Sequence, residues 1–311
     1  MPRSFEVVSV NLSADKGTTK SPVEEGTVDR LGLRGDAHAG DWLRQVSLLG
    51  EESIRRFVEE TGRPVRPGEF AENLTLRGAD LAGVRVLDRF RIGEVELEVT
   101  QIGKACHGPS CAIFREVGRC VMPKEGIFTR VLRGGTVRAG DRGEIVPWTL
   151  RARVVTLSDR ASRGEREDRS GPRARALLEE FLAARGWRAE IASAVLPDER
   201  EPLRAELLAA RDAGVDLVLT TGGTGIGPRD VTPEVVEEVC EKRIPGIMDA
   251  VRLKHGAGNP RALLSRSVAG LAGGTLVFAL PGSVRAVEEY LAEILPLLEH
   301  LLQMQRGLDT H

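Results

Sequence analysis

The chain has 311 residues, of which 41% are hydrophobic and 29% are charged, and its formal net charge is −2. This is the composition of an ordinary globular protein, and it excludes a disordered chain and a small disulfide-stapled scaffold. Because a typical domain has roughly 100–200 residues, the length predicts two domains, each large enough to bury a core of its own.

Charge and hydrophobicity also exclude several kinds of partner. Acidic and basic residues are nearly balanced in each half, so neither half has the positive field of a protein that binds nucleic acid or an anionic membrane. No apolar run approaches the ~18 residues that span a bilayer, and the first residues lack the apolar core of a signal peptide. We therefore expect a cytoplasmic protein whose four cysteines are thiols, namely Cys106, Cys111, Cys120 and Cys240.

The first half predicts a β-rich domain, because short runs of alternating apolar residues are separated by Gly, Asp and Pro. One helix interrupts these runs over 51–62, where apolar residues follow helical spacing until Gly62 ends it. We predict a partly closed barrel over 1–147, followed by a linker at 147–153. The predicted strands include 5–12, 84–93 and 95–102, the last with Val95, Leu97 and Val99 on one face.

The second half alternates between nearly continuous apolar strands and amphipathic helices. Such strands are buried on both faces of a parallel sheet, so residues 148–311 predict a three-layer α/β sandwich with a mostly parallel sheet. Thr232 is the expected N-cap of one helix, with Pro233 at its first position, and Pro296 predicts a bend or break in the closing helix. The predicted strands are 152–160, 189–198, 215–223 and 275–282, and the predicted helices are 174–186, 201–214, 232–242 and 284–305.

A glycine-rich turn, TTGGTGIGPRDVT at 220–232, lies between a buried strand and the start of a helix. In open α/β sheets ligands bind beyond the carboxyl ends of the strands, where such turns expose backbone N–H groups to anions. The turn lacks the GK[ST] of a Walker A loop and the third Gly of a dinucleotide fingerprint. It predicts a phosphate site of another kind, or a tight turn whose glycines need positive φ.

Charged and polar residues follow several strand ends of this predicted sheet. Asp198 follows the second strand and Asp230 lies in the glycine-rich turn, and the ends of consecutive parallel strands lie close together. Mg²⁺ prefers oxygen ligands and is commonly held by one or two carboxylates together with substrate phosphates. The two acids therefore predict a Mg²⁺ site, although each could instead be a turn or N-cap residue. Other candidates at strand ends are Ser158, Asp159, Arg160, Asp168, Ser170, Gly282 and Ser283.

The second half also carries a series of motifs: SDRASRGEREDRSG, LPDE, LTTGGTGIGPRDVTPE, LSRSVAG and LPGSVRAV. In these motifs and their order the chain resembles the MogA/MoaB family of molybdopterin adenylyltransferases, which includes the gephyrin G domain. The resemblance implies that molybdopterin and Mg-ATP bind, and that the terminal phosphate of the pterin attacks the α-phosphorus of ATP, giving adenylylated molybdopterin and pyrophosphate.

The same resemblance implies roles for individual residues. Asp198 and Asp230 would be the catalytic, Mg²⁺-associated acids, and the loop at 222–227 would contact the nucleotide phosphates. Arg266 has the planar, forked guanidinium that suits a phosphate, or it forms a surface ion pair. The implied cofactor-binding set is Ser158, Asp159, Gly222, Gly223, Thr224, Gly225, Ser265, Arg266, Gly282 and Ser283, of which the last four would lie at the pterin-phosphate end.

Three cysteines lie within GKACHGPSCAIFREVGRC, just after a predicted strand. Cys106 and Cys111 flank a Gly-Pro turn, where Lys104 or His107 would lower the pKa of an exposed thiol. A zinc site that includes Cys120 is disfavoured, because the adjacent Cys106 and His107 point to opposite sides and no Cys-x-x-Cys pair is present. The other interpretation is that the thiols are buried and inert.

The first half resembles the MOSC family in the segments KGTTKSPVEEGTVDRLGLRGDAHAG, GEFAENLTLRG and DRFRIGEVELEVTQ, the last followed by a Cys. The resemblance implies a β-barrel that binds molybdenum cofactor, with a Cys as sulfur carrier or metal ligand, and Cys106 falls at that position. Leu87 precedes Asp88 where the family has Gly. Lys20, Asp36, His38, Glu72 and Asn73 match motif positions and are candidate pocket residues, or else turn and core residues.

The two resemblances together predict a two-domain enzyme of molybdenum cofactor biosynthesis. Residues 148–311 would adenylylate molybdopterin, and residues 1–147 would receive, hold or modify the cofactor through Cys106, at a local concentration that the linkage raises. One alternative is a non-catalytic pterin carrier or scaffold, and another is a first half that acts as a reductase with molybdenum ligated by Cys106. Because family members are commonly trimers or larger, we also expect a homo-oligomer, with no nucleic-acid or membrane partner.

Overall fold

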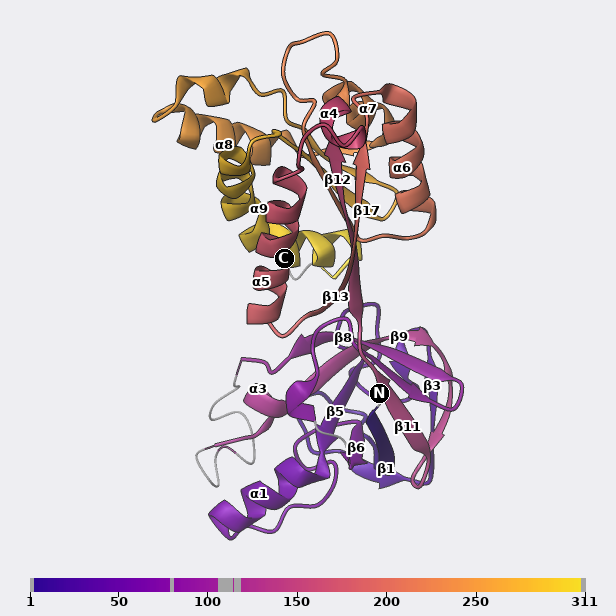
Figure 1. The fold of residues 1–311 in the computed structure, drawn as a ribbon. Coiled ribbons are helices and arrows are strands. Elements are labelled where there is room, and N and C mark those ends of the chain that lie inside the picture. The colour runs from indigo at the N-terminus through magenta and orange to yellow at the C-terminus, as the bar shows by residue number, and fades with distance from the viewer. Residues whose placement is uncertain (1–2, 79–80, 106–113, 115–118, 309–311) are drawn as a thin grey trace. The chain divides into compact units, whose positions relative to one another are not determined.

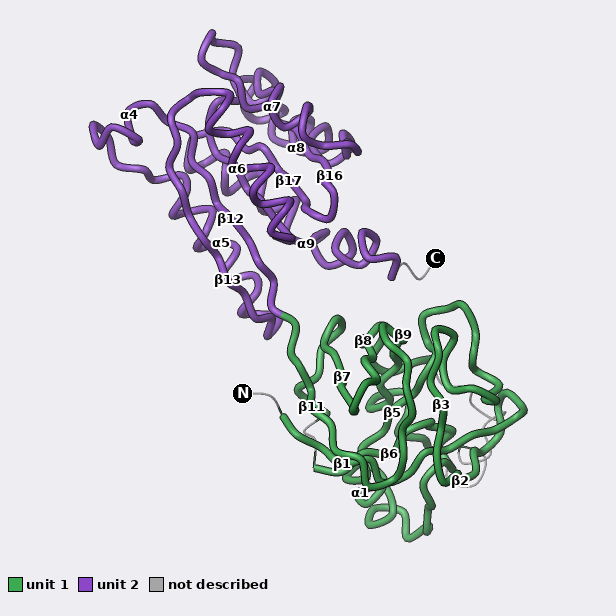
Figure 2. The backbone as a smooth tube through the Cα atoms, turned by 90° about the vertical axis from the view of Figure 1, so that its right-hand side faces the viewer, with its two compact units in different colours: residues 1–148 green, residues 149–311 purple. Residues whose placement is uncertain are grey.

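The computed structural model describes residues 3–78, 81–105, 114 and 119–308. The chain divides into two compact units, unit 1 with residues 1–148 and unit 2 with residues 149–311 (Figure 2). Within the described ranges, no helix is long and apolar enough to cross a bilayer.

Unit 1 is a β-barrel. Its strands are β1 (Arg3–Leu12), β2 (Ser21–Val23), β3 (Glu25–Asp29), β4 (Gly32–Leu33), β5 (Val46–Gly50), β6 (Leu74–Arg77), β7 (Arg89–Ile92), β8 (Val95–Ile102), β9 (Ile127–Arg133), β10 (Gly135–Arg138) and β11 (Arg142–Val146). Seven of these described strands follow the order β11-β7-β8-β9-β5-β6-β1, and the pairing of β1 with β11 closes the barrel. Neighbours are antiparallel except β5 and β6, which run parallel. The predicted barrel is therefore confirmed.

Alternating side chains fill the barrel. Val95, Leu97 and Val99 are fully buried in its core, as the alternation predicted. Outside the barrel, the predicted helix is α1 (Glu51–Thr61), which ends at Gly62 with a left-handed φ of 68°. The remaining helical elements are short, η1 (Leu81–Gly83) and α3 (Met122–Glu125).

One predicted strand of unit 1 is shorter than the sequence indicated. Apolar alternation predicted a strand over 84–93, but β7 begins only at Arg89. Just before it, the carboxylate of Asp88 accepts a hydrogen bond from the backbone N–H of Arg85 (3.0 Å), and Leu87 adopts a left-handed φ of 76°. This chain therefore places a buried leucine in a backbone conformation that L residues rarely adopt.

Unit 2 is the predicted α/β sandwich. Its strands are β12 (Thr149–Leu157), β13 (Arg188–Leu196), β14 (Leu217–Thr221), β15 (Lys242–Arg243), β16 (Ala269–Ala272) and β17 (Thr275–Leu280). Its helices are α4 (Asp159–Ser162), α5 (Ser170–Ala184), α6 (Arg200–Asp212), α7 (Thr232–Val239), α8 (Pro245–Gly256), η3 (Pro260–Leu264) and α9 (Val284–Gln305). The described strands follow the order β13-β12-β14-β17-β16-β15, with α6 and α7 on one face and α5 and α9 on the other (Figure 1).

The sheet of unit 2 sets the position of the candidate site. β13, β12, β14 and β17 are parallel neighbours, so their carboxyl ends form one row. The antiparallel strands β16 and β15 extend the sheet beyond β17 and were not predicted as strands. The loops that carry the candidate residues therefore leave the sheet at the same edge.

Three local predictions need correction. The linker predicted over 147–153 ends at Trp148, because Thr149 already pairs with β13 as the first residue of β12. The N-cap of α7 is Val231 and not Thr232, whose hydroxyl instead donates a hydrogen bond to the carbonyl oxygen of Gly222 (2.9 Å). The closing helix α9 is not broken at Pro296 but continues through it.

Candidate functional site

The glycine loop, residues 222–227, follows β14 and packs directly against its neighbours. Gly222 and Gly223 have left-handed φ values of 102° and 64°. A Cβ atom on Gly222 would clash with the carbonyl oxygen of Leu157 at the end of β12, and one on Gly223 would clash with the hydroxyl of Thr232. Positive φ and close approach together require glycine at both positions, so both the predicted tight turn and its place at the sheet edge are observed.

Two carboxylates lie against this loop. A Cβ added to Gly223 would be 3.7 Å from Oδ1 of Asp198, and one added to Gly225 would be 2.7 Å from Oδ2 of Asp230. Asp230 Oδ2 also accepts a hydrogen bond from the backbone N–H of Gly227 (2.8 Å). The fold thus brings together the two acids that the sequence singled out, although they are 32 residues apart in the chain.

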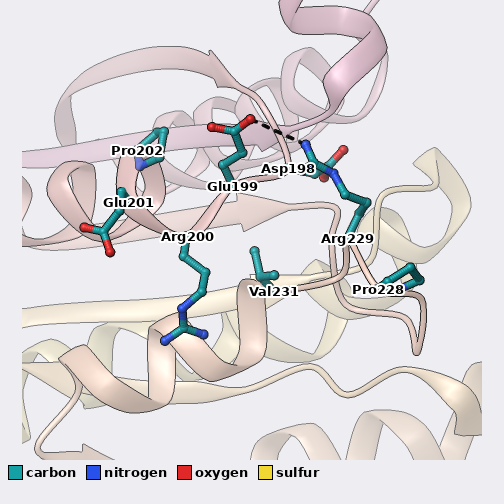
Figure 3. A pocket seen from close by; sticks show the side chains of 8 residues that line it. All are labelled: Asp198, Glu199, Arg200, Glu201, Pro202, Pro228, Arg229 and Val231. Atoms are coloured by element: carbon teal, nitrogen blue, oxygen red, sulfur yellow. Dashed lines mark ion pairs between the residues drawn. The ribbon is translucent and has the colours of Figure 1, made fainter.

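Asp198 is part of a hydrogen-bonded group with Asp159 and Arg229. The backbone N–H of Asp159 donates to Asp198 Oδ2 (2.8 Å), and the backbone N–H of Asp198 donates to Asp159 Oδ1 (3.1 Å). Arg229 binds Asp159 through both ends of its fork, with Nε 3.0 Å from Oδ2 and Nη2 2.7 Å from Oδ1. Nη2 of Arg229 is also 3.6 Å from Glu199, the ion pair drawn in Figure 3.

The two bonded aspartates differ in their electrostatic surroundings. Burial raises the pKa of Asp198, and the charges of Asp159 and Asp230 add to that rise. The hydrogen bonds from Arg229 lower the pKa of Asp159. The charge of Arg229 and the backbone N–H of Asp159 lower the pKa of Asp198, but burial outweighs them. Asp159 is instead bonded directly by the guanidinium of Arg229.

A hollow of about 350 Å³ opens beside Asp198, between the start of α6 and the segment that follows the glycine loop (Figure 3). In Figure 3 the guanidinium of Arg229 lies next to Asp198, whereas that of Arg200 points away from it. The described residues that line the hollow are Asp198, Glu199, Arg200, Glu201, Pro202, Pro228, Arg229 and Val231.

Arg266 supports the glycine loop from the side of η3. Its Nε donates to the carbonyl oxygen of Gly225 (2.6 Å), and its Nη2 donates to the carbonyl oxygen of Asp230 (2.8 Å). Its third contact is an ion pair with Glu234 on α7. The guanidinium of Arg266, which the sequence analysis suggested as a phosphate-binding group, is therefore hydrogen-bonded to the loop itself.

Ser265 and its neighbours complete this side of the loop. The hydroxyl of Ser265 lies 3.3 Å from that of Thr224 in the loop and 2.7 Å from that of Ser267. The backbone N–H of Arg266 donates to the carbonyl oxygen of Thr224 (2.9 Å). The loop is therefore fixed by both side-chain and backbone contacts.

The other predicted residues lie at strand ends, mostly as helix caps. Ser158 and Ser283 are the N-caps of α4 and α9, and each side-chain oxygen accepts a backbone hydrogen bond. A Cβ on Gly282 would be 3.2 Å from the Cα of Gly222, so the turn before α9 touches the glycine loop. Asp168 accepts a hydrogen bond from the backbone N–H of Gly171 in the first turn of α5 (3.1 Å).

Sequence reasoning missed two functional candidates. It did not assign Arg229 a role, although the arginine immediately precedes Asp230 in the glycine-rich motif and a cation there was a usable signal. It also missed the role of Thr232, which holds the loop in place by two hydrogen bonds. The backbone N–H of Thr232 donates to the carbonyl oxygen of Gly223 (3.1 Å), and its hydroxyl donates to the carbonyl oxygen of Gly222.

Among the described residues, no group of three or more His, Cys, Asp and Glu side chains converges as a ready-made metal site. Two carboxylates at a glycine loop nevertheless suit Mg²⁺, which takes its remaining ligands from phosphates and water. For the predicted thiol chemistry, Cys106, His107 and Cys111 lie outside the described residues. Cys240 is buried, and burial raises its pKa to about 12, so it is an inert thiol.

In unit 1, three of the candidate pocket residues form a cluster. Lys20 and Asp36 form an ion pair whose side chains are both 0% exposed, with Lys20 Nζ 2.6 Å from Asp36 Oδ2. Nδ1 of the half-buried His38 lies 3.4 Å from both Lys20 Nζ and Asp36 Oδ1. Burial lowers the pKa of Lys20 and opposes ionisation of Asp36, but hydrogen bonds from His38 and Lys20 hold the pKa of Asp36 below its ordinary value.

Glu72 and Asn73 lie among the polar residues of the barrel interior. Glu72 Oε1 accepts hydrogen bonds from the backbone N–H of Gly68 (2.6 Å) and the hydroxyl of Thr75 (2.9 Å), and burial raises the pKa of this acid. Asn73 Oδ1 accepts from the backbone N–H of Ser47 (3.0 Å). Both side chains therefore bind nearby turns and strands.

Comparisons with known proteins agree with this division. Residues 153–300 match the model of a probable molybdopterin binding domain, and residues 35–144 match that of the MOSC domain. The chain belongs to the MogA/MoaB-like family of molybdenum cofactor biosynthesis, with a MOSC domain ahead of the molybdopterin-binding domain.

Individual relatives give the extent of the likeness. The molybdopterin adenylyltransferase of Helicobacter pylori is 36% identical over 160 residues, which cover 51% of this chain and 89% of the relative. The molybdenum cofactor biosynthesis bifunctional protein of Synechococcus elongatus is 42% identical over 159 residues, and the chain spans about half of that relative, 48% of its length. Gephyrin of Dictyostelium discoideum is 38% identical over 156 residues, which cover 21% of it.

Proposed function

We propose that unit 2 transfers the adenylyl group of ATP to the terminal phosphate of molybdopterin. The observation that carries this proposal is that the carboxylates of Asp198 and Asp230 lie against one glycine loop at the edge of a parallel sheet, beside an open hollow. The Helicobacter relative named molybdopterin adenylyltransferase, of which the chain covers 89%, supports the same reaction.

The reaction needs positioning and charge neutralisation more than covalent help from the protein. An oxygen of the pterin phosphate forms a new bond to the α-phosphorus of ATP. The bond from that phosphorus to the α,β-bridging oxygen breaks, and pyrophosphate leaves with the electron pair. Negative charge therefore collects on the phosphates, and groups that meet it in fixed positions lower the barrier.

Asp198 and Asp230 would hold the Mg²⁺ ion, which neutralises phosphate charge when it is bound. The carboxylate of Asp198, whose pKa is raised by burial and by the charges of Asp159 and Asp230, suits a cation at this position. The glycine loop would bind the nucleotide phosphates through its backbone N–H groups, in the conformation that Gly222 and Gly223 allow by packing closely on Leu157 and Thr232.

The remaining residues would shape the pterin end. Ser265 and the turn at Gly282 and Ser283 adjoin the glycine loop and offer hydroxyl and backbone groups to the pterin phosphate. Because Arg266 is bonded to two loop carbonyls and to Glu234, we propose that it positions the loop. Ser158 and Asp159 would line the nucleotide side, next to Asp198.

The test is to incubate the purified chain with molybdopterin and Mg-ATP and to measure adenylylated molybdopterin by mass spectrometry and pyrophosphate by a coupled assay. Asp198→Asn and Asp230→Asn are each expected to lower product formation by about 100-fold or more, as the loss of transition-state charge stabilisation does, while molybdopterin still binds. Asp212→Asn removes an exposed charge at the end of α6 and is the control.

The outcomes separate the enzyme from a carrier. Wild-type-like turnover in both variants would reject the roles of the two acids. A wild-type chain that binds molybdopterin but forms no product would instead support a pterin carrier or scaffold.

For unit 1 we propose that the MOSC domain receives, holds or modifies the cofactor through Cys106. This proposal is supported by the match of residues 35–144 to the MOSC domain, a range that includes Cys106. Metal analysis of protein from a cofactor-replete host, with and without Cys106→Ser, distinguishes two forms of this proposal. Molybdenum that disappears in the variant supports a Cys-ligated reductase, and its absence from both proteins removes the basis for one.

A further inference from the structure

Arg229 lies at the proposed phosphate site but is paired with acids, and the proposed function gives it no role. It sits at the end of the glycine loop and lines the hollow next to Asp198 (Figure 3). Its guanidinium nevertheless bonds only acids, Asp159 through two hydrogen bonds and Glu199 at 3.6 Å, in the contacts of the described chain. The guanidinium of Arg229, which could bind a phosphate at this loop, is therefore paired with carboxylates instead.

The pairing of Arg229 with Asp159 is easy to exchange. The side chain of Arg229 is 55% exposed and that of Asp159 is 26% exposed, and ion pairs with a solvent-exposed partner contribute little to stability. A guanidinium binds a phosphate in the same two-pronged geometry as a carboxylate, with stronger charge on the acceptor.

The other arginine at the hollow is not placed for this exchange. Arg200 donates to Glu238 on α7 (2.9 Å), which also binds Arg204 (2.9 Å). In Figure 3 its guanidinium points away from Asp198. Of the described residues that line the hollow, Arg229 is the cation at the carboxylate pair.

We propose that Arg229 is a switching residue, which Asp159 holds in the free protein and which transfers its guanidinium to a phosphate of the bound nucleoside triphosphate. The proposal rests on the proposed function in taking ATP as the ligand. The transfer leaves the carboxylate of Asp159 beside that of Asp198, to which it is joined by two backbone hydrogen bonds. Binding of the phosphates thereby releases negative charge at the place where the accompanying divalent cation is needed.

The experiment measures two affinities of the full-length chain that do not depend on turnover. The first is the Kd for α,β-methylene-ATP with Mg²⁺, by calorimetry, and the second is the Kd for Mn²⁺ without nucleotide, by electron paramagnetic resonance. The variants are Arg229→Gln, Asp159→Asn and the two together. Arg163→Gln is the matched control, because Arg163 also acts on the charge of Asp159 but bonds Glu165 instead.

Arg229→Gln is expected to weaken binding of the ATP analogue about tenfold or more, in the wild type and in the Asp159→Asn background alike, because the lost contact is to phosphate. The same variant is expected to tighten Mn²⁺ binding without nucleotide, because it uncovers the charge of Asp159. Asp159→Asn alone should weaken analogue binding less than Arg229→Gln does, because it frees the guanidinium for the phosphate although it also removes a charge that attracts Mg²⁺. Arg163→Gln should change both Kd values less than twofold.

A purely structural pair would behave differently. The two single variants and the double variant would then weaken analogue binding equally, and Mn²⁺ binding would not tighten in Arg229→Gln; either result overturns the switch. A wild type that binds the analogue but makes no adenylylated pterin removes the proposed reaction and leaves the switch intact. A wild type that does not bind the analogue overturns both.

Discussion

The two units keep charged side chains in opposite ways. In unit 1, Lys20 and Asp36 are both fully buried and neutralise each other inside the fold. In unit 2, Arg229 is 55% exposed and its partner Asp159 is 26% exposed. Among the described residues, Asp198 forms no direct ion pair and feels the charge of Arg229 only through space. The buried pair in the barrel therefore serves to hold the fold together, whereas the more exposed charges at the glycine loop can exchange partners.

The shape of each cluster also has a different origin. The barrel cluster depends on side chains, because Lys20 and Asp36 are positioned by contact with each other and with His38. The site in unit 2 depends on backbone, because Gly222 and Gly223 fit only without a Cβ and Arg266 bonds loop carbonyls. We therefore expect the most destabilising substitutions in unit 1 to be those that leave a buried charge without its partner. In unit 2 we expect them to be those that add a side chain where the loop backbone packs closely.

The largest expected effect comes from breaking the buried pair. Asp36→Ala leaves Lys20 buried without a partner, which should lower the free energy of unfolding by about 3–5 kcal/mol. The measurement is urea-induced unfolding. Glu165→Ala breaks the exposed pair with Arg163 and should leave the free energy of unfolding nearly unchanged.

A double variant sharpens this test. Lys20→Met with Asp36→Leu replaces the pair by apolar groups of similar size, and most of the lost stability should return. An Asp36→Ala protein as stable as the Glu165→Ala protein would mean that the barrel charges behave like those of unit 2, and the contrast between the units would collapse.

The next largest effect tests the role of backbone fit. In Gly222→Ala a Cβ meets the carbonyl oxygen of Leu157 at a φ of 102°, so the free energy of unfolding should fall by at least about 2 kcal/mol. Gly164→Ala has a φ of 73° but no atom within 4 Å of the new Cβ, and it should cost only about 1 kcal/mol. Thermal unfolding compares the two. Equal losses would show that conformation alone, and not close packing on β12, requires glycine in the loop.

Much of the unit 2 site could be predicted from the sequence, because the rule that places it is general. Buried apolar runs indicated parallel strands, and parallel strands align their carboxyl ends. Asp198 after β13 and the glycine loop after β14 therefore leave the same edge of the sheet, on either side of the end of β12. The barrel fold of unit 1 was equally accessible from alternation, as the burial of Val95, Leu97 and Val99 shows.

What could not be predicted depends on contacts between residues far apart in the chain. No local pattern distinguishes a hydroxyl that caps its own helix from one that bonds a preceding loop, which is why Thr232 was misplaced. The bidentate pairing of Arg229 with Asp159 joins residues 70 positions apart. Leu87 in a left-handed conformation contradicts local preference and is sustained by its surroundings, including the bond from its N–H to the carbonyl of Val99 (2.8 Å).

The smallest expected effect is the change in stability that comes from the charge of Asp198 in unit 2. Burial raises the pKa of Asp198 in the folded protein, so the native state takes up a proton at a higher pH than the unfolded chain does. Stability therefore falls as pH rises from the ordinary Asp pKa of about 4 through the raised value, and it stays lower above that window. Asp198→Asn removes this penalty and should raise the free energy of unfolding at pH 7 by a few tenths of a kcal/mol, because the group is only partly buried.

The gain of Asp198→Asn should shrink as the pH is lowered through about 4, below which the wild-type acid is protonated in both states. Asp159→Asn should act in the opposite direction at pH 7, since Arg229 lowers the pKa of Asp159 and its charge stabilises the fold. Urea unfolding at pH 7 and pH 4 gives both signs, and added Mg²⁺ should stabilise the wild type more than Asp198→Asn. Asp198→Asn could instead be destabilising at pH 7 and insensitive to Mg²⁺. Asp198 would then stabilise the fold as Asp36 does, and the contrast between the two units would not hold.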